Sequence, residues 1–149
     1  EPILIKKYIK TFSQNISSHE EEKIIENMWK NYGMTFIEYI FLDYYKKKKP
    51  LCMIIPTKPV VGLSGDYISS KNNIVNNLSR KKKTGIYCTG IQVLNPKKIN
   101  QRIKPTSDFN LLWKRLMKIK QLYVSDIEPK KWYTVDNIEN YKNLKKTFK

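Results

Sequence analysis

The sequence predicts an α/β fold in which a mixed, mostly parallel sheet is flanked by helices. First, segments with helical spacing alternate with short strand-like segments along the 149 residues, as in other α/β chains. Second, the apolar run LCMII at residues 51–55 lies between two prolines and is typical of a strand buried on both faces. Third, the middle of the chain is rich in turn residues, which adds hairpins to the sheet.

The first third of the chain is expected to form helices around one strand. Residues 3–12 place their apolar side chains on one helical face. The next helix, SSHEEEKIIENMWKNYG, has capping-box spacing between Ser18 and Glu21. The pattern then predicts a strand over residues 34–40 and a short helix over residues 41–49.

The remainder is expected to alternate between strands and helices. VVGLSGDYIS predicts a hairpin with Gly65-Asp66 as its turn. Asn95-Pro96 ends a long strand over residues 84–94 and begins a helix. TSDFNLLWKRLMKIK predicts a helix capped by Ser107 or Asp108. NNIVNNLSRKKK, residues 72–83, predicts a strand with an exposed loop. Further strands are predicted at residues 121–127 and 131–136, and a closing helix at residues 137–149. No repeat or linker divides the chain, so we expect one domain over residues 1–149.

The amino-acid composition limits the classes of protein to which the chain can belong. The chain carries 29 Lys and Arg against 13 Asp and Glu, a formal net charge of +16, which attracts polyanions, nucleotides among them. No run of 18 apolar residues predicts a membrane span, and the first residues lack a signal-peptide pattern. Cys52 and Cys88 both lie in apolar runs, which favours buried, reduced thiols. We therefore expect a cytoplasmic protein without a membrane partner.

Several familiar catalytic patterns are missing from the sequence. His19 is the one histidine, so neither a zinc site nor a histidine-dependent triad is supported. No glycine-rich phosphate loop occurs. The basic runs at residues 46–49 and 80–83 fit either a phosphate-binding or a solvated surface. Gly65-Asp66 fits a turn better than a metal-binding strand end.

Asp136 is a stronger candidate for a functional side chain. It follows the apolar segment KWYTV and precedes the predicted closing helix. A carboxylate at the C-terminal end of a strand in an open α/β sheet lies where such sheets bind ligands, and it could help to hold Mg²⁺. An aspartate before a helix is equally suited to be its N-cap. The residue pattern alone leaves both roles open.

Three segments resemble one known family. TGIYCTGIQVLNPKKI is similar to a strand and short helix of the sugar-phosphate nucleotidyltransferases, and KWYTVDNIENYKNL is similar to the closing segment of that family. KPVVGLSGDYISSKNNIVNNLSRKKK resembles the hairpin that precedes them. The resemblance is strongest over residues 60–144. It implies a partial sheet of the nucleotide-diphospho-sugar-transferase type, and a fragment whose triphosphate-binding loop would lie upstream of Glu1.

The resemblance also implies a reaction and a set of site residues. The family transfers a nucleotidyl group from an NTP to a sugar 1-phosphate with release of pyrophosphate, assisted by Mg²⁺. By resemblance, Thr89 and Gly90 would lie beside the sugar phosphate, Trp132 would be the aromatic residue before the metal site, and Asp136 would bind the metal. No catalytic side chain is assigned. The alternative is a non-catalytic basic module that binds nucleic acid or other polyanions, which we favour less.

Overall fold

The computed structural model describes residues 36–59, 65–133 and 137–147. The chain divides into two compact units, Glu1–Glu38 and Tyr39–Lys149, and the description below concerns the second. The helices predicted over residues 3–12 and 17–33, together with His19 and Asp136, lie outside the described residues.

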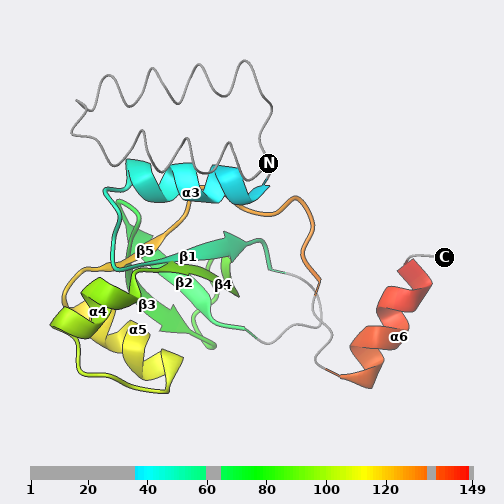
Figure 1. Ribbon diagram of the computed structural model, residues 1–149. Helices are drawn as coiled ribbons and strands as arrows, with labels where there is room; N and C mark the ends of the chain where they lie inside the picture. Colours follow the sequence, from blue (N-terminus) through cyan, green and yellow to red (C-terminus); the bar gives the residue numbers. More distant parts are fainter. Residues whose placement is uncertain (1–35, 60–64, 134–136, 148–149) are drawn as a thin grey trace, which may run out of the picture. The chain divides into compact units, whose positions relative to one another are not determined.

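The strands form a closed barrel in the order β1-β4-β2-β3-β5 (Figure 1). The barrel closes because β5 pairs with β1 as well as with β3. The described elements, in chain order, are α3 (Phe36–Lys46), β1 (Cys52–Thr57), β2 (Tyr67–Lys71), β3 (Ile74–Ser79), β4 (Tyr87–Leu94), α4 (Pro96–Arg102), α5 (Phe109–Lys118), β5 (Leu122–Val124) and α6 (Ile138–Thr147).

The prediction of a mostly parallel sheet flanked by helices is wrong. Among the described strands, β1 and β5 are parallel, whereas the other four pairings are antiparallel. The reason lies in the connections, because a parallel pairing needs a crossover of a dozen or more residues, usually a helix. Only the β4–β5 connection, which contains α4 and α5, includes helices between two successive described strands.

The hairpin of the barrel turns at a different position from the one predicted. Asn72 and Asn73 connect β2 to β3 with φ values of 52° and 62°. Two successive residues with positive φ match the right-handed twist of a tight hairpin, and asparagine tolerates this conformation well. Gly65 and Asp66 instead lie immediately before β2, and the preceding residues 60–64 are outside the described part.

β1 and β4 confirm two strand predictions and contain an irregularity. Every residue of β1 is buried, as expected for LCMII. The β1–β4 register shifts between Ile54 and Pro56, where Pro56 lacks an N–H group for the ladder. β4 passes this point with a bulge around Gly90, whose φ is +85°. The bulge thus lies opposite Ile55, next to the residue that cannot donate to the ladder.

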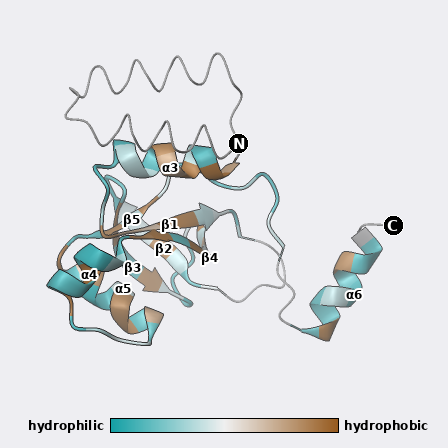
Figure 2. Ribbon diagram, viewed as in Figure 1, coloured by the Kyte–Doolittle hydropathy of each residue, from teal (hydrophilic) through white to brown (hydrophobic). Residues whose placement is uncertain are grey.

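The core lies inside the barrel and beneath α4 and α5. α5 packs against β3 and β5 (Figure 1). Asn95 caps α4 and Asp108 caps α5 through side-chain hydrogen bonds to backbone N–H groups, which confirms both predicted starts. Figure 2 shows the apolar residues concentrated along most of β1, whereas α4 is largely hydrophilic. The core cluster comprises Leu51, Cys52, Ile54, Ile68, Val75, Ile99, Ile103, Trp113, Leu116, Leu122 and Val124.

The two cysteines are free thiols, as predicted, although they differ in burial. Cys52 is completely buried, whereas Cys88 is partly exposed. Desolvation by burial raises the pKa of Cys52 to about 12 and also raises the pKa of Cys88. Both groups therefore remain neutral thiols near pH 7.

α3 corrects the strand predicted over residues 34–40, since Phe36–Lys46 is helical. The buried side chains Ile40, Asp43 and Tyr44 follow an i, i+3, i+4 spacing, which is the spacing of one helical face. This short apolar run fits both the two-residue period of a strand and the 3.6-residue period of a helix. Too few residues are present to distinguish the two periods. The Tyr44 hydroxyl donates a hydrogen bond to the Pro50 carbonyl at 3.0 Å, which ties the helix to the start of β1.

The C-terminal part agrees with the sequence in its helix and differs in its last strand. α6 confirms the closing helix, but the described residues of the predicted strand over 131–136 have no strand pairing. Within the described ranges, no helix combines the length and apolar character needed to cross a membrane.

Candidate functional site

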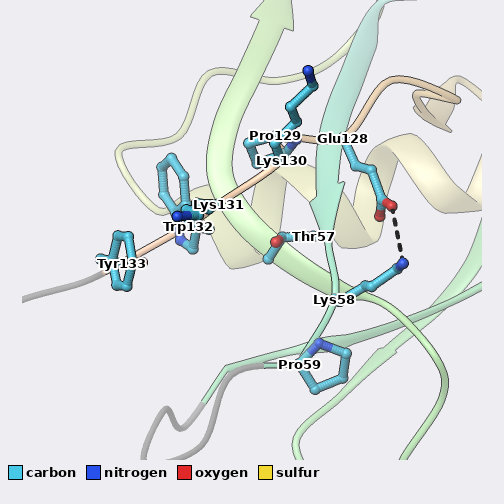
Figure 3. A pocket seen from close by; sticks show the side chains of 9 residues that line it. All are labelled: Thr57, Lys58, Pro59, Glu128, Pro129, Lys130, Lys131, Trp132 and Tyr133. Atoms are coloured by element: carbon cyan, nitrogen blue, oxygen red, sulfur yellow. Dashed lines mark ion pairs between the residues drawn. The ribbon is translucent and has the colours of Figure 1, made fainter. Parts of the chain in front are cut away.

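A pocket of about 510 Å³ opens where β1 ends (Figure 3). Residues 57–59 form one side, and residues 128–133 form the other. The two segments meet because β5 runs parallel to β1, so that the chain leaving β5 continues past the end of β1. The pocket is therefore a product of the one parallel pairing in the barrel.

The pocket combines positive charge with aromatic surface. Its lining includes Lys58, Lys130 and Lys131 together with Trp132 and Tyr133. Ammonium groups attract phosphate, and an aromatic face can pack against a sugar or base ring. The lining therefore has the composition expected for a phosphorylated ligand that also carries a ring.

The hydroxyl group of Thr57 lies within this lining. Thr57 is only 5% exposed, and its side chain forms no hydrogen bond with the residues that the structure describes. Figure 3 shows Thr57 between the Lys131–Trp132 side and the side formed by Lys58 and Glu128. Among the described residues, no buried side-chain oxygen or nitrogen lacks a hydrogen-bond partner, so the Thr57 hydroxyl is accessible to solvent, and water or a ligand can bond to it.

One ion pair crosses the pocket. The Lys58 Nζ atom lies 3.8 Å from a carboxylate oxygen of Glu128 (Figure 3). This separation is too long for a hydrogen bond, and the Lys58 side chain is 82% exposed. The pair is therefore weak, and a stronger anion could displace Glu128 from Lys58.

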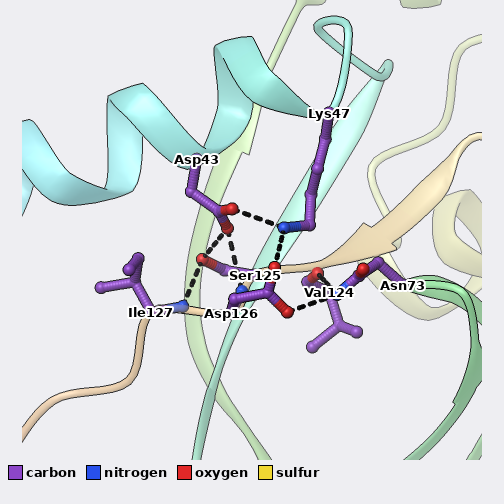
Figure 4. A network of polar contacts seen from close by, with 7 residues as sticks. All are labelled: Asp43, Lys47, Asn73, Val124, Ser125, Asp126 and Ile127. Atoms are coloured by element: carbon purple, nitrogen blue, oxygen red, sulfur yellow. Dashed lines mark hydrogen bonds and ion pairs between the residues drawn. The ribbon is translucent and has the colours of Figure 1, made fainter. Parts of the chain in front are cut away.

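A polar network that extends from the buried Asp43 and Ser125 to the exposed Asp126 fixes the segment that leads from β5 into the pocket (Figure 4). The Asp43 carboxylate of α3 accepts hydrogen bonds from the Ser125 hydroxyl and from the Asp126 N–H. Lys47 bridges Asp43 and Asp126. Asn73, in the β2–β3 turn, donates to Asp126 at 2.7 Å. Two separate parts of the chain, the end of α3 and the β2–β3 turn, thus hold residues 125–126, only two residues before the pocket wall begins.

The charge on Asp126 depends on this network. Desolvation acts to raise the pKa of Asp126, but the hydrogen bonds from Lys47 and Asn73 and the positive charge of Lys47 outweigh it. The net effect is a pKa below the usual value of 3.8. Asp126 therefore remains ionised at neutral pH, in the form that accepts both hydrogen bonds.

The structure brings one of the predicted site residues into the pocket. Trp132 lines it, whereas Thr89 and Gly90 do not. The Thr89 hydroxyl donates to the Ile55 carbonyl at 2.7 Å and accepts from the Ile91 N–H at 3.0 Å. These bonds hold the β4 bulge, so this hydroxyl has a structural use. Gly90 supplies the positive φ of the bulge.

The described residues do not provide a set of ligands suited to Mg²⁺. Mg²⁺ favours carboxylate and phosphate oxygens, and the one carboxylate of the pocket lining, Glu128, is paired with Lys58. No group of three or more His, Cys, Asp or Glu side chains suited to a metal occurs in the described ranges. We therefore derive no step that passes through a metal ion.

Sequence reasoning missed most of the pocket. Thr57 and Lys58 end a buried strand, and no sequence motif marks them as ligand-binding residues. Glu128 becomes relevant only through the parallel pairing of β5 with β1. A signal was available for Lys130 and Lys131, since two lysines directly precede Trp132, and basic residues beside an aromatic residue are typical of phosphate-bearing ligands.

Comparison with known proteins gives no match to a family model, a curated protein or a solved structure.

Proposed function

We propose that the chain is a nucleotidyltransferase-like domain that binds a sugar 1-phosphate in the pocket lined by residues 57–59 and 128–133. The observation that carries the proposal is the meeting of Trp132 with three lysines in that pocket. Trp132 was selected from the sequence as a substrate-binding residue, and its surroundings suit a ring that carries a phosphate. The resemblance of three sequence segments to sugar-phosphate nucleotidyltransferases supplies the reaction.

In that reaction, a phosphate oxygen of the sugar 1-phosphate attacks the α-phosphorus of an NTP. The new P–O bond forms as the bond between the α-phosphorus and the bridging oxygen breaks, and pyrophosphate leaves. Little covalent chemistry is required of the protein, so positioning and charge stabilisation dominate. The lysines of the pocket would hold the attacking phosphate, and Trp132 would pack against the sugar. The proposal also includes Mg²⁺ with Asp136 as its ligand. This part of the proposal rests on the sequence alone.

The test is pyrophosphate release from NTPs in the presence of hexose 1-phosphates. Release should require both substrates, and Trp132→Ala should lower kcat/KM by about five- to tenfold, the effect of losing one aromatic contact. Tyr141→Ala is the matched control, because Tyr141 is an exposed aromatic residue outside the pocket. Asp136→Ala tests the proposed metal ligand. No release with any NTP and hexose 1-phosphate would refute this function.

A second candidate function is non-catalytic binding of polyanions. The formal charge of +16 and the exposed run of residues 80–83 favour it. Binding to a generic duplex should then weaken steeply with salt, because phosphate contacts release counterions. Measurement of the duplex Kd between 50 and 300 mM NaCl tests this, and an affinity that is absent or insensitive to salt would exclude it.

A further inference from the structure

Glu128 introduces a negative charge into a pocket whose other charged lining residues are lysines. Its carboxylate forms no hydrogen bond with the described residues, since Lys58 lies 3.8 Å away. The Thr57 hydroxyl is likewise without a partner in the described part of the chain. Figure 3 shows Thr57 between Glu128 on one side and Lys131 with Trp132 on the other. One pocket therefore contains a carboxylate that is ion-paired but accepts no hydrogen bond from the described residues, a hydroxyl, and further lysines at other positions.

These two kinds of group favour different parts of one ligand. A phosphate is repelled by a carboxylate and attracted by ammonium groups, so it is expected on the side of Lys131. An ionised carboxylate only accepts hydrogen bonds, and it requires a donor such as a sugar hydroxyl. The Thr57 hydroxyl can donate or accept and lies between the two sides.

We propose that Glu128 is a specificity-determining residue that accepts hydrogen bonds from the hydroxyl groups of a sugar phosphate. This inference deepens the proposed function and rests on the pocket assigned there. Lys131 takes the phosphate, and Glu128 with Thr57 takes the hydroxyl groups. Inorganic phosphate uses only the lysine side. The pocket consequently prefers a phosphorylated sugar to a bare phosphate ion.

The test is calorimetric titration of the full chain with glucose 1-phosphate, mannose 1-phosphate and inorganic phosphate. The wild-type chain should bind at least one hexose 1-phosphate more tightly than inorganic phosphate. Glu128→Ala should weaken hexose 1-phosphate about tenfold, the effect of losing a hydrogen bond to a charged group. In the same variant, the affinity for inorganic phosphate should be unchanged or higher, because a repulsive charge is removed.

Two further variants separate hydrogen bonding from charge. Glu128→Gln retains an acceptor oxygen without the charge, so its affinity for hexose 1-phosphate should fall between those of wild type and Glu128→Ala. Glu139→Ala also removes one negative charge, but from α6 and outside the pocket lining, and it should leave the preference unchanged.

Opposite results overturn the inference in identifiable ways. If Glu128→Ala raises the affinity for hexose 1-phosphate and for inorganic phosphate equally, Glu128 acts only by repelling the phosphate group. If the wild-type chain binds hexose phosphates no better than inorganic phosphate, or binds neither, the pocket does not recognise a sugar. If hexose 1-phosphate binds with the expected preference but pyrophosphate is never released, the specificity inference stands and the proposed transferase function fails.

Discussion

Thr89 shows how one residue can match a functional motif and still have a structural task. Its hydroxyl connects the Ile55 carbonyl to the Ile91 N–H and so holds the bulge beside Pro56. By the sequence resemblance, the backbone at this position would instead lie beside a sugar phosphate. Measurements of stability and of ligand affinity distinguish the structural role of Thr89 from a role in ligand binding.

Thr89→Val should therefore lower the free energy of unfolding by about 1 kcal/mol, the typical net value of a lost hydrogen bond. Its hexose 1-phosphate affinity should stay close to that of the wild type, because Thr89 does not line the pocket. Urea unfolding and calorimetric titration of the same preparation measure both quantities. A large loss of affinity with unchanged stability would instead assign Thr89 to the binding site.

Two leucines of α5 give a matched comparison of burial. Leu116 is fully buried in the core, whereas Leu111 is 39% exposed on the same helix. Leu116→Ala should lower the free energy of unfolding by about 2–5 kcal/mol, because it leaves a cavity in a packed core. Leu111→Ala should cost less than about 1 kcal/mol, as expected for a residue at the surface. Urea unfolding of both variants checks the order, and equal losses would contradict this placement of α5.

At the scale of elements, the contact between α3 and β5 depends on Asp43. Its buried carboxylate accepts hydrogen bonds from Lys47, Ser125 and the Asp126 N–H. Asp43→Ala should lower the free energy of unfolding by about 2–3 kcal/mol, because it leaves buried donors without an acceptor. The exposed control Glu139→Ala should have little effect. Denaturant unfolding is the measurement, and equal stability of the two variants would show that this network contributes nothing.

Disruption of this network should also reach the pocket. Residues 125–126 are held by Asp43, Lys47 and Asn73, and the pocket wall begins at Glu128. Asp43→Ala is therefore expected to weaken ligand binding even though Asp43 does not line the pocket. This places α3 among the elements that position the site.

Acid should weaken the same connection through Asp126. Its pKa is lowered in the folded chain, so the folded state binds fewer protons than the unfolded state over the range between the two pKa values. The corresponding stability is present above the usual pKa of 3.8 and is lost as the pH falls through the folded value. The effect should be small, because the Asp126 side chain is 65% exposed and solvent screens its charge.

The measurement is urea unfolding between pH 6 and pH 2, with Asp126→Asn as the comparison. The wild-type chain should lose more stability than the variant below about pH 4. Identical pH profiles for the two proteins would show that Asp126 makes no such contribution.

At the scale of the whole molecule, the net charge of +16 is the dominant electrostatic feature. Repulsion among so many cations destabilises a compact state, and salt screens it over a Debye length of about 10 Å at 0.1 M. The urea midpoint should therefore rise between 20 and 500 mM NaCl. A midpoint that falls would mean that favourable ion pairs outweigh the repulsion. Sodium chloride is preferable to sulfate here, because sulfate also strengthens apolar burial.

Local features were predictable from the sequence because their causes are local. Asn95-Pro96 and Asp108 carry the chemistry of helix starts, and each begins a helix where expected. The run LCMII is too apolar for a solvent-facing strand, and β1 is buried throughout. Trp132 lines the pocket, but it was chosen by resemblance to a known family segment, and its role in ligand binding stays a prediction.

Strand direction and the composition of the site depend on contacts that are distant in sequence, and only the tertiary structure decided them. Nothing within residues 122–124 indicates that β5 pairs parallel with β1 and antiparallel with β3, yet this closes the barrel and brings residues 128–133 beside residues 57–59. Alternating apolar residues specify which face of a strand is buried, but not its partner or its direction. The sequence by itself determined the buried strand, the helix starts at Asn95-Pro96 and Asp108, and the basic charge, whereas long-range pairing decided the barrel and the pocket.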